Sequence, residues 1–129
     1  MKKVFDSFAP LPRDNRYQHS DSEMRHLLPI LAQLNFHGVN FGPTIPAEVI
    51  RAAMPRTEIH GQIAPMTLRN GTFEDVVAEV KWDFAAVGAD GGLFVTSAGS
   101  VSAGTTLERL REWMWAVETY ARYDRKVVD

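Results

Sequence analysis

Histidine and aspartate stand two residues apart near the start of the chain, as His19-Ser20-Asp21. In an extended segment, side chains at this spacing point to the same side, which suits two ligands of one divalent metal ion such as zinc. We therefore predict His19 and Asp21 as metal ligands, with a third ligand from a neighbouring strand end. In the alternative interpretation, Asp21 caps the following helix and His19 is an ordinary polar residue of a strand.

A second histidine, His60, stands beside Gly61 at the end of another predicted strand. If the strand ends align as in a parallel barrel, His19, Asn40, His60 and Ser97 lie around one rim, where such folds place their chemistry. Imidazole exchanges protons near neutral pH, so we predict His60 and Ser97 as catalytic residues and Asn40 as a substrate contact. In the alternative interpretation, His60 only bonds to a neighbouring strand. Ser97 lacks the G-x-S-x-G context of a nucleophile elbow.

The stretch 91–108 combines a short apolar run, a loop of small residues and a helix start. Thr105 stands three residues before Glu108, which is the spacing of a capping box. Helix N–H groups and loop backbone converge at such a point and favour an anionic group, so Ser100 and Thr105 are predicted to bind substrate. No G-x-G-x-x-G and no G-x-x-x-x-G-K-[ST] occurs, which leaves a nucleotide site unsupported.

Hydrophobic spacing predicts about four strand–helix units that position these residues. The predicted strands and the helices that follow them are 16–22 with 23–34, 36–43 with 44–54, 56–63 with 72–84, and 91–97 with 107–123. Pro29 is expected to kink or interrupt the first helix. Thr72 and Asp75 have the spacing of a helix cap.

Two helix faces are predicted from the same spacing. In the third helix the buried side chains are expected to be Phe73, Val76, Val77, Val80 and Phe84. In the last helix they are expected to be Leu107, Leu110, Met114, Val117 and Ala121. Trp113 and Trp115 cannot share one helix face, so one of them is expected to be exposed, whereas Trp82 is expected to contribute to helix packing.

Such alternation requires a parallel sheet with right-handed crossovers. Two α/β architectures satisfy it: an open sheet with helices on both faces, or half of a (β/α)8 barrel with helices on one face. A lone half-barrel exposes two strand edges and its inner face, so it is expected to seek a partner. We assign residues 17–123 to this domain, 1–16 to an N-terminal arm and 124–129 to a polar tail.

The composition limits the possible classes of function. The chain has 129 residues, a net charge of -2 and a pI near 6.1, which gives no electrostatic reason to bind nucleic acid. It has no cysteine, so a metal site must use His, Asp, Glu or main-chain oxygen. No apolar run approaches the ~18 residues of a membrane span, and we expect a cytoplasmic protein without a membrane partner.

Several segments together resemble a known family. These are Ile59-His60-Gly61-Gln62-Ile63, Leu68 to Val76, Gly91 to Val101, and Thr105 to Leu110. They resemble the C-terminal half of the uroporphyrinogen decarboxylase superfamily, which also contains cobalamin-dependent methyltransferases. The resemblance spans roughly residues 17–123 and implies a TIM barrel, of which this chain supplies the last four units.

The resemblance also implies a metal site, with departures from the family pattern. In the methyltransferase branch, zinc is held by an H-x-C motif and a cysteine in the final loop. His19 falls on the motif's histidine, Asp21 replaces its thiolate, and Gly99 stands about where the last cysteine belongs. The decarboxylase branch has a histidine in that final loop, where this chain has Gly99 or Ser100, and its catalytic aspartate belongs to the other half of the barrel.

Two functional hypotheses follow. In the first, a half-barrel acts in methyl transfer linked to a corrinoid, or in tetrapyrrole processing, on a small-molecule substrate. It works as a homo-oligomer or with a complementary half-barrel chain. In the second, the half-barrel is catalytically silent and serves as an interaction or ligand-binding module. A third interpretation, an open flavodoxin-like sheet that binds a phosphorylated molecule, requires helices on both faces of the sheet.

Overall fold

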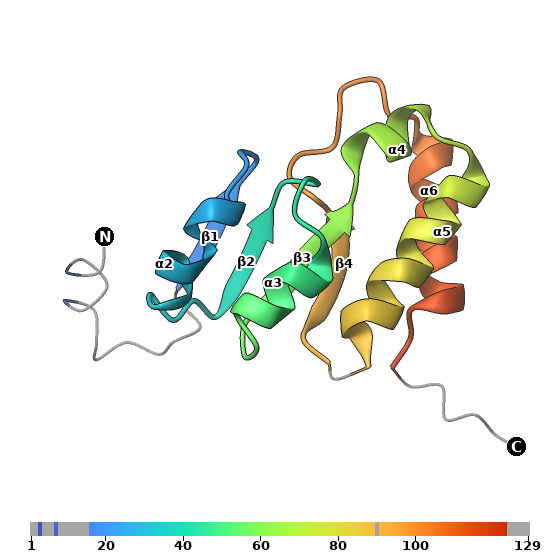
Figure 1. The fold of residues 1–129 in the computed structure, drawn as a ribbon. Helices are drawn as coiled ribbons and strands as arrows, with labels where there is room; N and C mark the ends of the chain where they lie inside the picture. The colour runs from blue at the N-terminus through green and yellow to red at the C-terminus, as the bar shows by residue number, and fades with distance from the viewer. Residues whose placement is uncertain (1–2, 4–6, 8–15, 90, 124–129) are drawn as a thin grey trace, which may run out of the picture.

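Four parallel strands form the centre of the molecule. The computed structural model describes residues 3, 7, 16–89 and 91–123. The strands are β1 (Tyr17–Ser20), β2 (Gly38–Phe41), β3 (Glu58–Ile63) and β4 (Leu93–Ser97). They lie in the order β1-β2-β3-β4, each parallel to the next. Because the pairing is parallel, all four carboxyl ends reach the same edge of the sheet, at the top of Figure 1.

Helices connect each strand to the next. After β1 come the 3-10 turn η2 (Arg25–Leu27) and α2 (Leu28–Ala32), and after β2 comes α3 (Ala47–Ala53). After β3 come α4 (Pro65–Asn70), α5 (Phe73–Asp83) and a π-helical turn, η3 (Phe84–Gly88). The chain then passes through β4 to α6 (Leu107–Tyr120). The predicted α/β class with about four strand–helix units is therefore confirmed.

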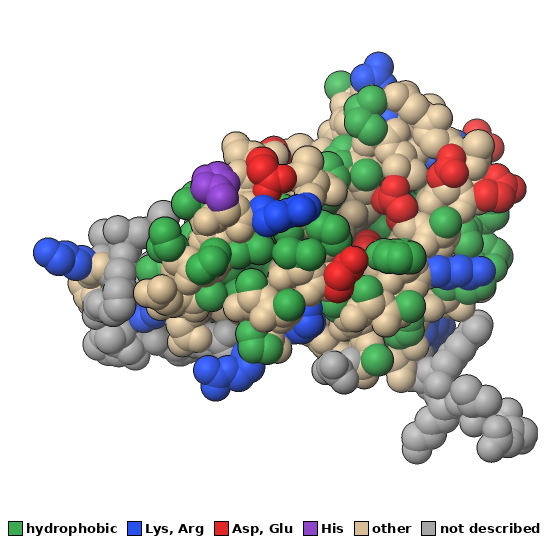
Figure 2. Space-filling model, viewed as in Figure 1, with side chains coloured by type: hydrophobic (Ala, Val, Ile, Leu, Met, Phe, Trp, Pro, Cys, Tyr) green, Lys and Arg blue, Asp and Glu red, His purple; other side chains and the backbone are tan. Residues whose placement is uncertain are grey.

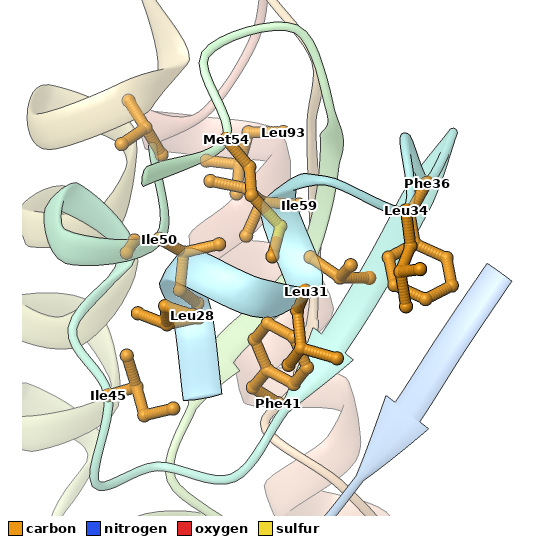
Figure 3. Close-up of a cluster of buried hydrophobic side chains, with 13 residues drawn as sticks. Leu28, Leu31, Leu34, Phe36, Phe41, Ile45, Ile50, Met54, Ile59 and Leu93 are labelled. Atoms are coloured by element: carbon orange, nitrogen blue, oxygen red, sulfur yellow. The ribbon is translucent and has the colours of Figure 1, made fainter. Parts of the chain in front are cut away.

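One face of the sheet is covered by helices and the other is not. The side chains of Val39, Phe41, Ile59 and Leu93 point to one face and join the main hydrophobic core. Figure 3 shows this core between the strands and the helices α2 and α3, which contribute Leu28, Leu31 and Ile50. Alternate strand residues point to the opposite face, where side chains of β1, β3 and β4 contact one another instead of a helix.

A second hydrophobic cluster continues the same helix layer beside β4. Its buried members come from β3, α4, α5 and α6 and are Ile63, Leu68, Val76, Val80 and Ala116. Val95 of β4 borders both clusters, so α5 and α6 lie on the same face as α2 and α3. An open sheet with helices on both faces, and the flavodoxin-like interpretation with it, does not describe this arrangement. The architecture is consistent with part of a TIM-like barrel.

Local sequence signals explain where α5 begins and which face it buries. The Thr72 side chain accepts a hydrogen bond from the Asp75 N–H, and the Asp75 carboxylate accepts one from the Thr72 N–H. This is the predicted capping box, which satisfies two N–H groups at the helix start. On the predicted face Val76 and Val80 are fully buried, while Val77 and Phe84 are partly buried against the two clusters.

The first two helices are shorter than predicted. The helix expected over 23–34 is divided into η2 and α2, with Pro29 in the first turn of α2, where a missing N–H costs no hydrogen bond. The helix expected over 44–54 begins only at Ala47, because Pro46 is its N-cap and has extended backbone angles. Helix α4 was not predicted, since six residues are too few to show a helical period.

The predictions for α6 were partly wrong. Its N-cap is Thr106, whose side chain accepts from the Arg109 N–H, and not Thr105. Leu107 and Met114 are exposed, whereas Ala116 is fully buried. Val117 and Ala121 of the predicted face do pack against the second cluster, together with Trp113. The buried face is therefore rotated from the predicted one, away from Leu107 and Met114 and toward Trp113 and Ala116. A small residue at the closest approach to α5 lets the two helices pack tightly.

One prediction about the tryptophans is confirmed and another is wrong. Trp113 is partly buried against the second cluster while Trp115 is exposed, as expected from their spacing. Trp82, in contrast, is 65% exposed and does not contribute to helix packing as predicted. The predicted arm and tail fall outside the described residues, apart from Lys3, Ser7 and Arg16. No helix in the described part of the chain is long and apolar enough to cross a membrane.

Candidate functional site

The carboxyl edge of the sheet brings the first predicted pair together. His19 is the third residue of β1 and Asp21 follows the strand, and their Nε2 and Oδ1 atoms lie 3.3 Å apart. Gly99, in the loop after β4, lies against the same carboxylate, because a Cβ atom at position 99 would overlap Asp21 Oδ1. Gly99 also has a φ of +89°, which favours glycine. The fold thus joins the H-x-D pair to the final loop.

Asn40 is buried at this edge and connects three elements. Its Nδ2 donates to the main-chain oxygens of His60 and Ser97, the latter at 3.0 Å. Its Oδ1 accepts from the Gly99 N–H at 3.1 Å. Both amide protons and the amide oxygen are thereby used within the protein. Asn40 holds the ends of β3 and β4 and the final loop in register, and substrate contact remains a prediction for it.

The other residues predicted along the final loop are placed near the same edge. Ser97 is buried, and its Oγ donates to the Gly99 carbonyl oxygen at 2.5 Å. Thr105 Oγ1 donates to the Ser102 carbonyl oxygen at 2.8 Å, one residue before the α6 cap. Ser100 is exposed. Of these three residues, Ser100 is therefore the one whose exposed side chain a ligand can reach.

His60 belongs to a different group on the uncovered face of the sheet. Its Nε2 lies 3.5 Å from Glu58 Oε2, and that oxygen is also 3.3 Å from His37 Nε2. Its ring stacks on Phe94 with centroids 4.6 Å apart and meets Tyr17 edge-on at 5.2 Å. Glu58 opens β3 and His37 precedes β2, so the imidazole of His60 faces the amino ends of the strands. It therefore does not join His19 and Ser97 at the rim.

We call this group the inner-face cluster; its members are Tyr17, His37, Glu58, His60 and Phe94. Sequence reasoning missed all but His60. One signal was present, since Glu58 and His60 are two residues apart in a strand and must share a face. A carboxylate beside an imidazole can orient the ring. Partial burial raises the pKa of the Tyr17 phenol above its ordinary value, which keeps it neutral.

A buried acid lies on the opposite, helix-bearing side of the sheet. Asp83 of α5 is 5% exposed and accepts from the Gln62 N–H at 2.9 Å. Burial raises its pKa to about 6, against the hydrogen bond from Gln62, and the nearby charges of Glu79 and Glu48 raise it further. Acidic side chains gather over α5 on this side (Figure 2). Asp83 borders a surface pocket of about 200 Å³ together with Trp82.

The described residues offer a metal ion only a pair of ligands at the rim. Imidazole nitrogen and carboxylate oxygen both suit zinc or cobalt. Nevertheless, the described part of the chain contains no group of three or more His, Cys, Asp or Glu residues that could hold a metal ion. His19 and Asp21 can thus fill two coordination positions, and any further ligand must come from outside this set.

Comparison with known proteins supports the fold. No protein-family model matches the chain, and no curated protein matches it. Among solved structures, the chain is similar to a methyltransferase from Methanosarcina mazei, with a TM-score of 0.75 and 19% sequence identity. The similarity covers 95% of this chain and 36% of that one. At this identity the likeness shows the fold alone: a methyltransferase-like α/β fold, of which this chain spans about a third of the neighbour's length.

Proposed function

We propose that this chain is a half-barrel domain of the uroporphyrinogen decarboxylase-like superfamily that takes part in corrinoid-linked methyl transfer. The observation that carries the proposal is the junction of His19 and Asp21 with the Gly99 loop at the carboxyl edge of the sheet. That edge is where barrels of this kind place their chemistry. The similarity to the fold of a methyltransferase supports the choice of reaction over tetrapyrrole decarboxylation.

In this proposal, each group of residues has a separate task. His19 and Asp21 hold a divalent metal ion, zinc being the ion that the resemblance implies, and when bound it supplies Lewis-acid activation. Ser100 and the loop up to Thr105 contact an anionic part of a small-molecule substrate. His60, oriented by Glu58, exchanges a proton with a group that enters the barrel interior. Ser97 and Asn40 fix the loop on which Ser100 lies.

Metal titration tests the central step of the proposal. Isothermal titration of the intact chain with Zn²⁺ and Co²⁺ should show binding that His19→Ala removes. His26→Ala is the matched control, because His26 is an exposed histidine that is not one of the predicted ligands. Equal heats for the wild type and His19→Ala would reject the metal site. A screen of corrinoids for spectral shifts then tests the link to methyl transfer.

A second candidate function is favoured by one observation. The polar atoms of Asn40 and the hydroxyl of Ser97 are used within the protein, which is the pattern of a structural edge more than of a reactive one. In this second proposal the chain is a catalytically silent half-barrel module whose uncovered face binds a partner. Absence of metal binding and of any corrinoid or porphyrin shift, with a partner still bound, would select this function.

A further inference from the structure

We propose that two copies of this chain close into one ring, in which β4 of each copy pairs in parallel with β1 of the other. The uncovered faces of both sheets then form the interior. This inference rests on the half-barrel interpretation given above and names the partner that completes it. A two-fold axis along the ring axis keeps all strands parallel, and two sheets of four strands supply the eight of a closed barrel.

The strand edges fit this arrangement. In the described part of the chain β1 and β4 are the terminal strands, with four and five residues. Unpaired edge N–H and C=O groups favour addition of another strand. The Tyr123 hydroxyl already bonds to both the N–H and the C=O of Leu93, at 3.2 and 3.1 Å. The N–H and C=O of Leu93 are therefore already used, and the partner strand pairs with β4 from Val95 onward.

The proposed ring has two seams, where β4 of one copy meets β1 of the other. Each of these strands carries an aromatic side chain. Tyr17 on β1 is 48% exposed and Phe94 on β4 is 50% exposed, and both point to the uncovered face beside His60. A closed ring removes this apolar area from water, which favours association. A single chain leaves it in contact with solvent.

The charges on the uncovered face also suit a second copy. Glu58 lies within 3.5 Å of two imidazoles, and Asp21 lies beside His19. Each acid is thus accompanied by a group that can carry the opposite charge. Two identical faces can approach one another without a field of one sign on both, and such self-complementarity is what a two-fold interface requires.

The helix layer offers a matching outer seam. Helices α2 and α6 are the terminal helices of the layer, and each carries an exposed apolar side chain, Ile30 and Met114. Beside β4, a pocket of about 270 Å³ is lined by Val95, Trp113 and Met114. In the ring, α6 of one copy becomes the neighbour of α2 of the other. An apolar side chain of the second copy can then fill this pocket.

The second copy also completes the candidate site. Because all strands of the ring are parallel, the His19 and Asp21 of both copies reach the same mouth. The rim then carries two imidazoles and two carboxylates around one opening, instead of the single pair that one chain provides.

Measurement of the oligomeric state with a matched pair of variants tests the ring. Light scattering with size exclusion should show a dimer for the intact chain. Tyr17→Asp/Phe94→Asp should raise the dimer dissociation constant at least about tenfold, since it places charges inside the ring. Trp82→Asp is the control, because Trp82 is as exposed but lies on α5 away from both seams. Circular dichroism confirms that the variants remain folded.

Crosslinking identifies which surfaces meet. The chain has no cysteine, so Ile30→Cys and Met114→Cys introduce the only thiols. A short bis-maleimide should join the two single variants when they are mixed, and should join neither variant to itself. A monomeric wild type, a dimer unaffected by the double variant, or crosslinks without this pairing would each overturn the ring. A dimer that binds no corrinoid upholds the ring and rejects the methyl-transfer proposal.

Discussion

At the scale of single residues, the titration of Asp83 should make the stability of the protein depend on pH. Its pKa is about 6 in the folded protein against an ordinary value of 3.8. Between these values the folded state binds more protons than the unfolded state, so the free energy of unfolding falls as the pH rises. The free energy of unfolding stops falling above the pKa that Asp83 has in the folded protein. The difference between the two pKa values corresponds to a total decrease on the order of 3 kcal/mol.

We expect Asp83→Asn to remove this loss, because an amide oxygen can still accept from the Gln62 N–H without carrying charge. The variant should be more stable than the wild type at pH 8 by about 1 to 3 kcal/mol, with the difference vanishing toward pH 4. Urea denaturation at several pH values measures it. Asp75→Asn is a control of opposite sign, since hydrogen bonds from Thr72 lower the pKa of Asp75. Parallel pH curves for Asp83→Asn and wild type would contradict the prediction.

Gly99 allows a second prediction at the same scale. Gly99 and Gly91 both have positive φ, +89° and +78°. Among the described atoms, nothing lies within 4 Å of a Cβ built at Gly91, whereas one built at Gly99 meets Asp21. Gly91→Ala should therefore cost about 1 kcal/mol of backbone strain, and Gly99→Ala about 2 to 3 kcal/mol because Asp21 must also move. Thermal denaturation compares the two, and equal losses would show that the Gly99 loop does not hold Asp21.

At the scale of elements, α6 shows how packing selects a helix face. Sequence spacing allows several apolar stripes on this helix, since it carries Leu107, Leu110, Trp113, Met114 and Val117. The structure buries the stripe that contains Ala116, because a small side chain permits close approach to α5. The stripe containing Met114 stays exposed in the single chain. The choice depends on the shape of α5, which the sequence of α6 does not contain.

This rotation can be tested by substitution on either stripe. Ala116→Leu should destabilise the fold by about 1 to 3 kcal/mol, because the added methyl groups have no space between α5 and α6. Met114→Ala should change the stability of the single chain by less than about 0.5 kcal/mol. Chemical denaturation at low protein concentration measures both. If Met114→Ala lowered the free energy of unfolding more than Ala116→Leu, the buried face would instead be the one predicted from the sequence.

At the scale of the whole molecule, the feature that matters is the face of the sheet that no helix covers. Four strands with helices on one face leave the inner-face cluster exposed to solvent in a single chain. If a second copy covers this face, folding is linked to association by mass action. We expect the melting temperature of the wild type to rise with protein concentration. It should not rise for Tyr17→Asp/Phe94→Asp, and calorimetry across a hundredfold concentration range measures this. A melting temperature independent of concentration in both would speak for a stable single chain.

Local signals in the sequence determined the order of strands and helices, the parallel sheet and the start of α5. Each depends on residues a few positions apart, such as the Thr72 and Asp75 cap. The closeness of His19 and Asp21 was also local, because the residues share one strand end. Their roles as ligands, and the assignment of the other site residues, remain predictions.

Only the tertiary structure decided which residues meet across the sheet. Asn40 bonds to Gly99 and His60 lies between Tyr17 and Phe94, contacts that join segments 34 to 59 positions apart. Such contacts depend on strand register and side-chain direction in the assembled sheet, which periodicity along the chain does not specify. For the same physical reason, the separation of His60 from the rim and the stripe that α6 buries were fixed by packing between distant elements.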